Sequence, residues 1–187
     1  MKWTTSARMV GEIVAVQAIQ SSAIRKFPVE DTVAINLHFE NCALGAFLLS
    51  DTAASAKSWE QTSQENEAYP TYGDEDAYVA IGTNGSLAIP TMRLKRYPRK
   101  EDHSWFEPFQ SETIPLQRTD PLAAQIEHFV AVIRGSADPL VTARDGLQNL
   151  RATDAILEAA RTGATVKIST KEAWKVEDQA VFRRRAE

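Results

Sequence analysis

The sequence lacks the glycine pattern with which most nucleotide-binding folds hold phosphate groups. Its 187 residues include eight glycines, and no two of them are separated by a single residue, so no G-x-G is present. A G-K-S/T sequence of the Walker type is missing as well. Because a glycine-rich turn at the start of a helix is the usual cradle for a phosphate, we expect no dinucleotide-binding residues and no nucleoside-triphosphate site in this chain.

Cysteine and histidine are scarce. Cys42 is the only cysteine, which excludes an internal disulfide framework and favours a reducing compartment. The three histidines are His38, His103 and His128, and none has a second histidine or a cysteine at a spacing typical of metal ligands. The sequence therefore predicts no metal site, and it offers no residue for catalysis. His103 lies close to Trp105 in the segment "KEDHSWFEP", and we keep it as a candidate for ligand binding.

Charge and hydropathy exclude two further classes of protein. The net charge is -4 and the pI is near 5.5, whereas a nucleic-acid binder carries a basic surface. No run approaches the ~18 apolar residues that span a bilayer, and the opening "MKWTTSARMVGEI" lacks the apolar core of a secretory signal. We expect a soluble, cytoplasmic protein that binds neither nucleic acid nor membrane.

The first half of the sequence predicts strands. Residues 31–40 alternate apolar and polar side chains, which is typical of a half-buried strand. Residues 11–20 and 43–51 are apolar on both faces. A tight connection around Asn41 joins the second and third strands, and Cys42 fits the left-handed backbone of such a turn poorly.

A hairpin and two short strands follow. Asn84-Gly85 between two apolar runs is the strongest local signal for a hairpin, and Pro90 indicates a bulge or an edge position. Residues 111–117 and 165–169 add two short strands. The sequence thus predicts about seven strands in total.

Two helices are predicted in the second half. In residues 119–139, Asp120 is suited to cap the helix, with Pro121 in its first turn and Gly135 at its end. In residues 142–163, Thr142 and Asp145 resemble a capping box, and Gly163 ends the helix. The predicted apolar stripes are Leu122, Ile126, Phe129 and Ile133 in the first helix, and Leu147, Leu150, Leu157 and Ala160 in the second.

This order of elements predicts an α+β fold, an open and mostly antiparallel sheet with the two main helices packed on one face. A sheet of about seven strands is roughly 30 Å wide, whereas two helices cover only about 20 Å of one face. The other face has no helix to cover it, yet residues 43–51 are apolar on both sides. An uncovered apolar face implies a partner, and we expect a homodimer, the commonest closed assembly.

The long segment 53–76 has no periodic signal, and such loops are usually functional or mobile. It contains "SWEQTSQEN", where Trp59 supplies an apolar platform, and Glu60, Glu65 and Asn66 supply hydrogen-bonding groups for the hydroxyls of a sugar or polyol. Alternatively, Trp59 packs against the edge of the sheet and its polar neighbours are solvated. The loop alone does not decide between the two interpretations.

Several segments together resemble one family. They are "GEIVAVQA", "FPVEDTVAINLHFENCALGAF", the loop just described, "AIGTNGSLAIP" and "HFVAVIRGSADPLVTARDGLQNLRATDAILEAARTG". Over about residues 10–170 they resemble the C-terminal domain of the Gfo/Idh/MocA oxidoreductases. The last segment is the most specific, because a Gly-x-x-x-Pro link joins its two helices.

The resemblance implies a fold, an activity and a cofactor. Members of the family are typically NAD(P)-dependent dehydrogenases of sugars and polyols, with an N-terminal Rossmann domain that binds the cofactor and carries a catalytic lysine. Their second domain shapes the substrate site and often forms dimers. This sequence has no counterpart of the cofactor fingerprint or the lysine, so NAD or NADP is expected only with a separate Rossmann-domain partner.

Three hypotheses follow from the resemblance. The chain is the substrate-binding and dimerisation domain of a sugar or polyol dehydrogenase, inactive without a cofactor domain; or a stand-alone, non-catalytic sugar-binding or assembly module; or a structural remnant. We expect a single domain over residues 11–170, preceded by a helix remnant over residues 1–10 and followed by an extension over residues 171–187. The substrate-binding candidates are Trp59, Glu60, Glu65, Asn66 and His103.

Overall fold

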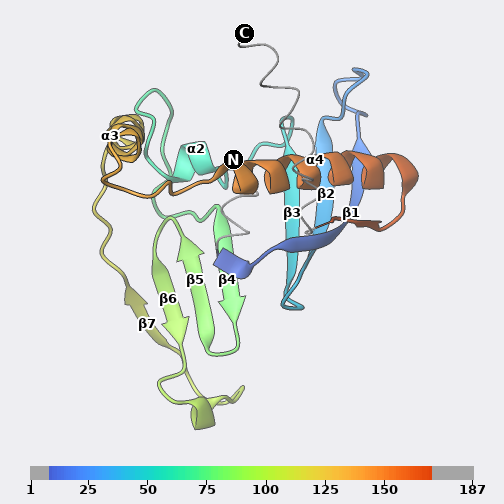
Figure 1. Cartoon of the computed structure of the whole chain (residues 1–187). Helices are drawn as coiled ribbons and strands as arrows, with labels where there is room; N and C mark the ends of the chain where they lie inside the picture. Colours follow the sequence, from blue (N-terminus) through green and yellow to red (C-terminus); the bar gives the residue numbers. More distant parts are fainter. Residues whose placement is uncertain (1–8, 170–187) are drawn as a thin grey trace. The chain divides into compact units, whose positions relative to one another are not determined.

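The structure is a computed structural model, which describes residues 9–169 (Figure 1). The described chain separates into two compact units. The first unit comprises the chain up to Ala53 and again from Leu140, and the second runs from Ala54 to Pro139. Of the expected terminal segments, residues 171–187 and most of residues 1–10 lie outside the described residues. Each unit has a sheet of its own.

The first unit contains a four-stranded antiparallel sheet in the order β3-β2-β1-β8. Its strands are β1 (Ile13–Ser21), β2 (Thr32–Phe39), β3 (Leu44–Ser50) and β8 (Val166–Lys167). The three long strands form two hairpins, as the alternation of the sequence predicts. Helix α4 (Ala143–Thr162) packs across one face of this sheet, mainly against β1 (Figure 1).

The core of the first unit lies between α4 and the sheet. Inward-facing side chains of β1 and β2 supply its centre, and Val16 and Leu37 are completely buried. From the helix come Ala152, Ala155, Ile156 and Ala159. The helix thus packs mainly through alanines, with Ile156 as its one large buried side chain among the described residues.

The packed face of α4 differs from the predicted one. Leu147, Leu150 and Leu157 were expected to face the sheet, but they are exposed, and the alanine-rich face packs instead. The sequence prediction followed the leucines, whereas three alanines and Ile156 form the buried face. The two ends of α4 are as predicted: Thr142 and Asp145 form a capping box at its start, and Gly163 at its end is left-handed, with φ 69°.

The second unit contains another four-stranded antiparallel sheet, in the order β4-β5-β6-β7. Its strands are β4 (Tyr78–Gly82), β5 (Gly85–Ile89), β6 (Arg93–Arg96) and β7 (Gln110–Thr113). Asn84-Gly85 makes the predicted hairpin between β4 and β5. Pro90, which follows a cis peptide bond, ends β5 at a turn that leads into β6.

Three helical segments complete the second unit: α2 (Trp59–Thr62), the 3-10 helix η1 (Lys100–Asp102) and α3 (Pro121–Ile133). Asp120 caps α3 as predicted, accepting hydrogen bonds from the N–H groups of Leu122 and Ala123. Helix α3 has no buried residue, and its predicted stripe of Leu122, Ile126, Phe129 and Ile133 is exposed.

The predicted α+β class, with open antiparallel sheets and two main helices, is confirmed. The strands number eight in the described residues and divide into two sheets, where the sequence analysis expects about seven in one. Pairing between distant strands decides this division, and local patterns do not encode it. Within residues 9–169, no helix is both long and apolar enough to cross a membrane.

The uncovered side of the first sheet is the surface on which the dimer expectation rests. We call it the open face, and it consists of Gln17, Ile19, Ala34, Asn36, His38, Leu44, Ala46 and Leu48, all exposed. Registered pairs place Ile19, Ala34 and Leu48 in one row, and Gln17, Asn36 and Ala46 in the next. A shallow hollow of about 600 Å³ lies over these two rows. The face is therefore apolar toward one end and polar at its middle.

The turn between β2 and β3 gives a first prediction. Cys42 has φ 67°, a left-handed conformation that is unfavourable for a residue with a Cβ. We expect Cys42→Gly to raise the free energy of unfolding by about 0.5–1 kcal/mol, because relief of that strain exceeds the added entropy of glycine in the unfolded chain. Chemical denaturation measures the change. Glu40→Gly in the same turn, where φ is not positive, should instead lower stability; if both variants lose stability, the strain is not real.

Candidate functional site

Helix α2 positions Trp59 at one end of the second sheet. Ser58 caps this short helix, because its side chain accepts a hydrogen bond from the N–H of Gln61 (3.3 Å). The end of the helix is anchored by burial: Thr62 and Ser63 are buried, and the Thr62 hydroxyl donates a hydrogen bond to the Ser58 carbonyl (2.8 Å). Trp59 therefore lies on a capped, hydrogen-bonded helical turn.

Trp59 contacts two groups that could receive a ligand with it. Its indole N–H donates to the Glu65 carboxylate (Nε1 to Oε2, 2.8 Å). Its ring lies against Tyr78, with ring centroids 5.9 Å apart and planes tilted by 36°. Partial burial raises the pKa of Tyr78 above its ordinary value, so the phenol stays protonated at neutral pH. We call Trp59, Glu65 and Tyr78 the Trp59 cluster.

The start of β4, which carries Tyr78, is fixed by an ion pair. The Asp76 carboxylate accepts hydrogen bonds from the Thr91 hydroxyl and the Arg93 guanidinium. Burial opposes ionisation of this carboxyl, but the bonds from Thr91 and Arg93 outweigh it and hold the pKa of Asp76 below its ordinary value. The Asp76 carboxyl is therefore ionised at neutral pH. Its bonds to Thr91 and Arg93 tie the residues just before β4 to the turn after Pro90 and to the start of β6.

The other two loop candidates lie close by in sequence but differ in what their side chains do. The Asn66 side chain accepts a hydrogen bond from the N–H of Ala68 (3.0 Å), so it shapes the turn that follows. Glu60 is exposed in the first turn of α2. Its carboxylate lies one residue after Trp59 and faces solvent, available to hydroxyl groups of a ligand.

His103 is not brought to the Trp59 cluster. It stacks on Tyr97 (ring centroids 4.8 Å apart), and the N–H of Tyr97 donates to the carbonyl of Asn84 in the β4–β5 turn (3.1 Å). Strand register puts this turn at the opposite end of β4 from Tyr78. His103 thus belongs to a separate aromatic group with Tyr97 and Phe109.

Tyr78 was not among the residues predicted for the site. The signal was present, because Tyr78 opens a predicted strand directly after the loop that contains Trp59. What sequence alone does not give is that the chain turns back so that residue 59 meets residue 78.

Aromatic surface beside carboxylates is suited to bind a polyhydroxylated molecule, since the ring packs against C–H groups and the carboxylates accept from hydroxyls. Nothing in the cluster is arranged as a nucleophile with a neighbouring base. Among residues 9–169, no group of three or more His, Cys, Asp or Glu side chains could hold a metal ion.

Comparison with known proteins identifies the family of the chain. The sequence model of an oxidoreductase family, described as its C-terminal alpha/beta domain, matches residues 7–168. No curated protein sequence matches the chain.

Solved structures share the fold. Aldose-aldose oxidoreductase from Caulobacter crescentus, complexed with glycerol, is similar with a TM-score of 0.61 and 22% identity, over 89% of this chain and 44% of that one. Levoglucosan dehydrogenase in complex with NADH and levoglucosan gives a TM-score of 0.62 and 18% identity, over 90% and 48%. The WlbA dehydrogenase from Bordetella pertussis, in complex with NADH and UDP-GlcNAcA, gives a TM-score of 0.56 and 18% identity, over 90% of this chain and 42% of that one.

This chain spans less than half the length of each of these three proteins. At such low identity the likeness concerns the fold, whereas the family match rests on the sequence and covers most of the chain. The chain therefore belongs to the Gfo/Idh/MocA oxidoreductase family, and residues 7–168 are the C-terminal α/β domain of that family.

Proposed function

We propose that this chain is the substrate-binding and self-association domain of an NAD(P)-dependent sugar or polyol dehydrogenase. The observation that carries the proposal is the family match over residues 7–168, which covers the sheet domain and no cofactor domain. The similar solved structures are oxidoreductases more than twice as long as the matched region. On this proposal, residues 7–168 bind the substrate and a Rossmann domain supplies the cofactor.

The Trp59 cluster supports a polyhydroxylated substrate. Trp59 and Tyr78 offer adjacent ring surfaces, and Glu65 is fixed beside them by its bond to the indole. Glycerol, levoglucosan and UDP-GlcNAcA, named with the similar structures, all carry hydroxyl groups. We assign Trp59, Tyr78, Glu65 and Glu60 to substrate binding and leave His103 as a weaker candidate, since it lies at the other end of β4.

A Rossmann-domain partner is the proposed source of NAD or NADP, because the sequence has no G-x-G with which to bind a dinucleotide. Helix α4 offers a surface for such a partner. Leu147, Leu150 and Leu157 are exposed on it, although each is large and apolar. Covering them would remove apolar surface from water, which favours association.

The open face of the first sheet supports self-association. Ile19, Leu44 and Leu48 are each about three-quarters exposed there, and a sheet face of this kind is commonly covered in a two-fold dimer. The single cysteine favours a reducing compartment for this assembly.

The test of the proposal is a mixing experiment. The chain is combined with a separately expressed Rossmann domain of a family member, and NAD(P) reduction is followed with a panel of sugars and polyols. We expect activity in the mixture and none with either component alone, because hydride transfer needs a bound nicotinamide. Reduction of NAD(P) by the isolated chain would contradict the proposal.

The second candidate is a stand-alone sugar-binding module, which the self-contained geometry of the Trp59 cluster favours. It predicts saturable binding of a sugar or polyol to the isolated chain, measured by calorimetric titration. Trp59→Ala is then expected to weaken binding by about tenfold, since it removes the aromatic platform. Trp105→Ala is the control, because Trp105 is fully exposed elsewhere in the second unit. If the wild type and Trp59→Ala bind the ligand with equal affinity, the Trp59 cluster is not the binding site.

A further inference from the structure

The open face is too small to hold two copies together by itself. Seven residue pairs join β2 to β3. At ~3.4 Å per residue and ~4.8 Å between strands, the three long strands span about 24 by 14 Å, roughly 340 Å² in projection. A stable interface of ordinary size buries about 800 Å² on each partner. A dimer formed through this sheet therefore needs further surface from the same molecule.

The loop between β1 and β2 supplies apolar surface at the same end of the sheet as the apolar row of the open face. Within residues 22–31, Ile24 is 72% exposed, Phe27 57% and Val29 63%. The loop leaves β1 and enters β2 beside the row of Ile19 and Ala34, the apolar end of the open face. Three large apolar side chains are thus exposed in the loop that continues two strands of the open face beyond their ends.

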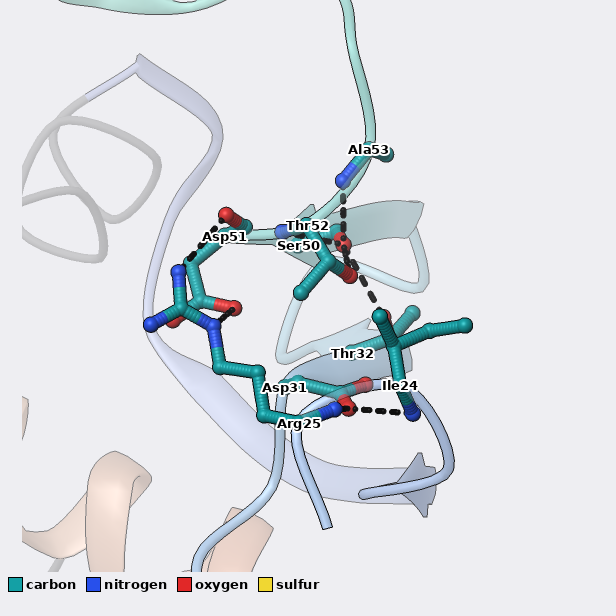
Figure 2. A network of polar contacts seen from close by, with 8 residues as sticks. All are labelled: Ile24, Arg25, Asp31, Thr32, Ser50, Asp51, Thr52 and Ala53. Carbon is teal, nitrogen blue, oxygen red and sulfur yellow. Dashed lines mark hydrogen bonds and ion pairs between the residues drawn. The ribbon is translucent and has the colours of Figure 1, made fainter. Parts of the chain in front are cut away.

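The loop is held in one shape by a buried carboxylate. Asp31 is only 4% exposed, and its Oδ2 accepts hydrogen bonds from the N–H groups of Ile24 (2.9 Å) and Arg25 (3.0 Å). These bonds, that from Arg25 foremost, hold the pKa of Asp31 below its ordinary value although burial opposes it. Figure 2 shows the carboxylate between the backbone nitrogens of these two residues.

An ion pair and a hydrogen bond also hold the loop to the residue that follows β3. The Arg25 guanidinium forms an ion pair with the Asp51 carboxylate (3.2 Å) and donates to the Asp51 carbonyl (3.1 Å) (Figure 2). Polar groups are thus used to order a loop whose apolar side chains remain in water. Such order lowers the entropic cost of binding, since the loop is already in its contact shape.

We propose that residues 24–29 form the second half of the self-association surface and contact a second copy of this chain. The inference rests on the proposed self-association of the open face. The area that the open face lacks and the position of the loop at its apolar end both indicate that the loop takes part in the contact that covers this face, and the proposed self-association makes the occupant a second copy. In a two-fold dimer each copy contributes its loop, so the added surface counts twice.

Sedimentation equilibrium of the full chain tests the inference. Phe27→Ser and Ile24→Ser, both exposed in the single copy, are each expected to raise the dimer dissociation constant at least tenfold and to leave the circular dichroism spectrum unchanged. Ile81→Ser is the matched control, because Ile81 is 82% exposed on β4 in the other unit. Its dissociation constant should equal that of the wild type.

The outcomes separate this inference from the proposed function. If Ala34→Glu on the central strand of the open face dissociates the dimer while both loop variants leave it intact, the loop has no part in the interface and self-association stands. If Ile81→Ser is the variant that weakens the dimer, the missing area comes from the second unit and the inference is wrong. A monomeric wild-type chain at about 100 μM would overturn both.

Discussion

Leu37→Ala is expected to lower the free energy of unfolding by about 3 kcal/mol. Leu37 lies in the middle of β2 and is completely buried. Its side chain also packs under Gly45 on the neighbouring strand, where an added Cβ would lie 3.5 Å from the Leu37 Cβ. Removal of the isobutyl group leaves a cavity that the two flanking strands cannot close, because their hydrogen-bonded register fixes their spacing.

Urea denaturation at one protein concentration measures this loss. Leu157→Ala is the control, since Leu157 is half-exposed on the side of α4 away from the sheet. We expect that variant to change stability by no more than about 0.5 kcal/mol. A loss for Leu37→Ala as small as that of the control would show that β2 is not at the centre of the core.

Elements whose signals are local were predictable from the sequence. The period-two pattern of residues 31–40 became β2, the Asn84-Gly85 pair became a hairpin turn, and Thr142 with Asp145 became a capping box. Each of these rests on residues within a few positions of one another, so no tertiary information is needed. The expected left-handed turn is also present, at Cys42.

Features decided by distant contacts were not predictable. The eight strands divide between two sheets because β3 pairs only with β2, and β4 only with β5, among the described strands. Helix α4 packs through Ala155 and Ala159, although its leucine stripe is more apolar. Which face of the helix meets the sheet depends on the strands that it packs against, and sequence alone does not reveal this.

The candidate site was predictable in part. Trp59 and Glu65 are six positions apart, and the structure joins them by a hydrogen bond. His103 was grouped with them because it is near Trp105 in sequence, yet strand register carries it to the other end of β4. Tyr78 was overlooked for the opposite reason, as it is distant in sequence from Trp59 and adjacent in space.

Self-association through the open face gives the second large effect. Ala34→Glu is expected to raise the dimer dissociation constant at least a hundredfold, which corresponds to about 2.7 kcal/mol. Ala34 lies on the central strand of the open face, between Ile19 and Leu48 in the same row. In a single copy the new carboxylate remains in water, so folding is unaffected. In the dimer it would be buried among apolar side chains without a cation, which is strongly unfavourable.

Sedimentation velocity over a range of concentrations measures the shift, and the circular dichroism spectrum checks that the variant is folded. Leu157→Glu is the matched control: it places the same charge on the same unit, on the helix away from the open face. Because the isolated chain has no partner to cover α4, that variant should dimerise like the wild type. If Leu157→Glu dissociates the dimer and Ala34→Glu does not, two copies meet through their helices, and the open face must be covered by something other than a second copy.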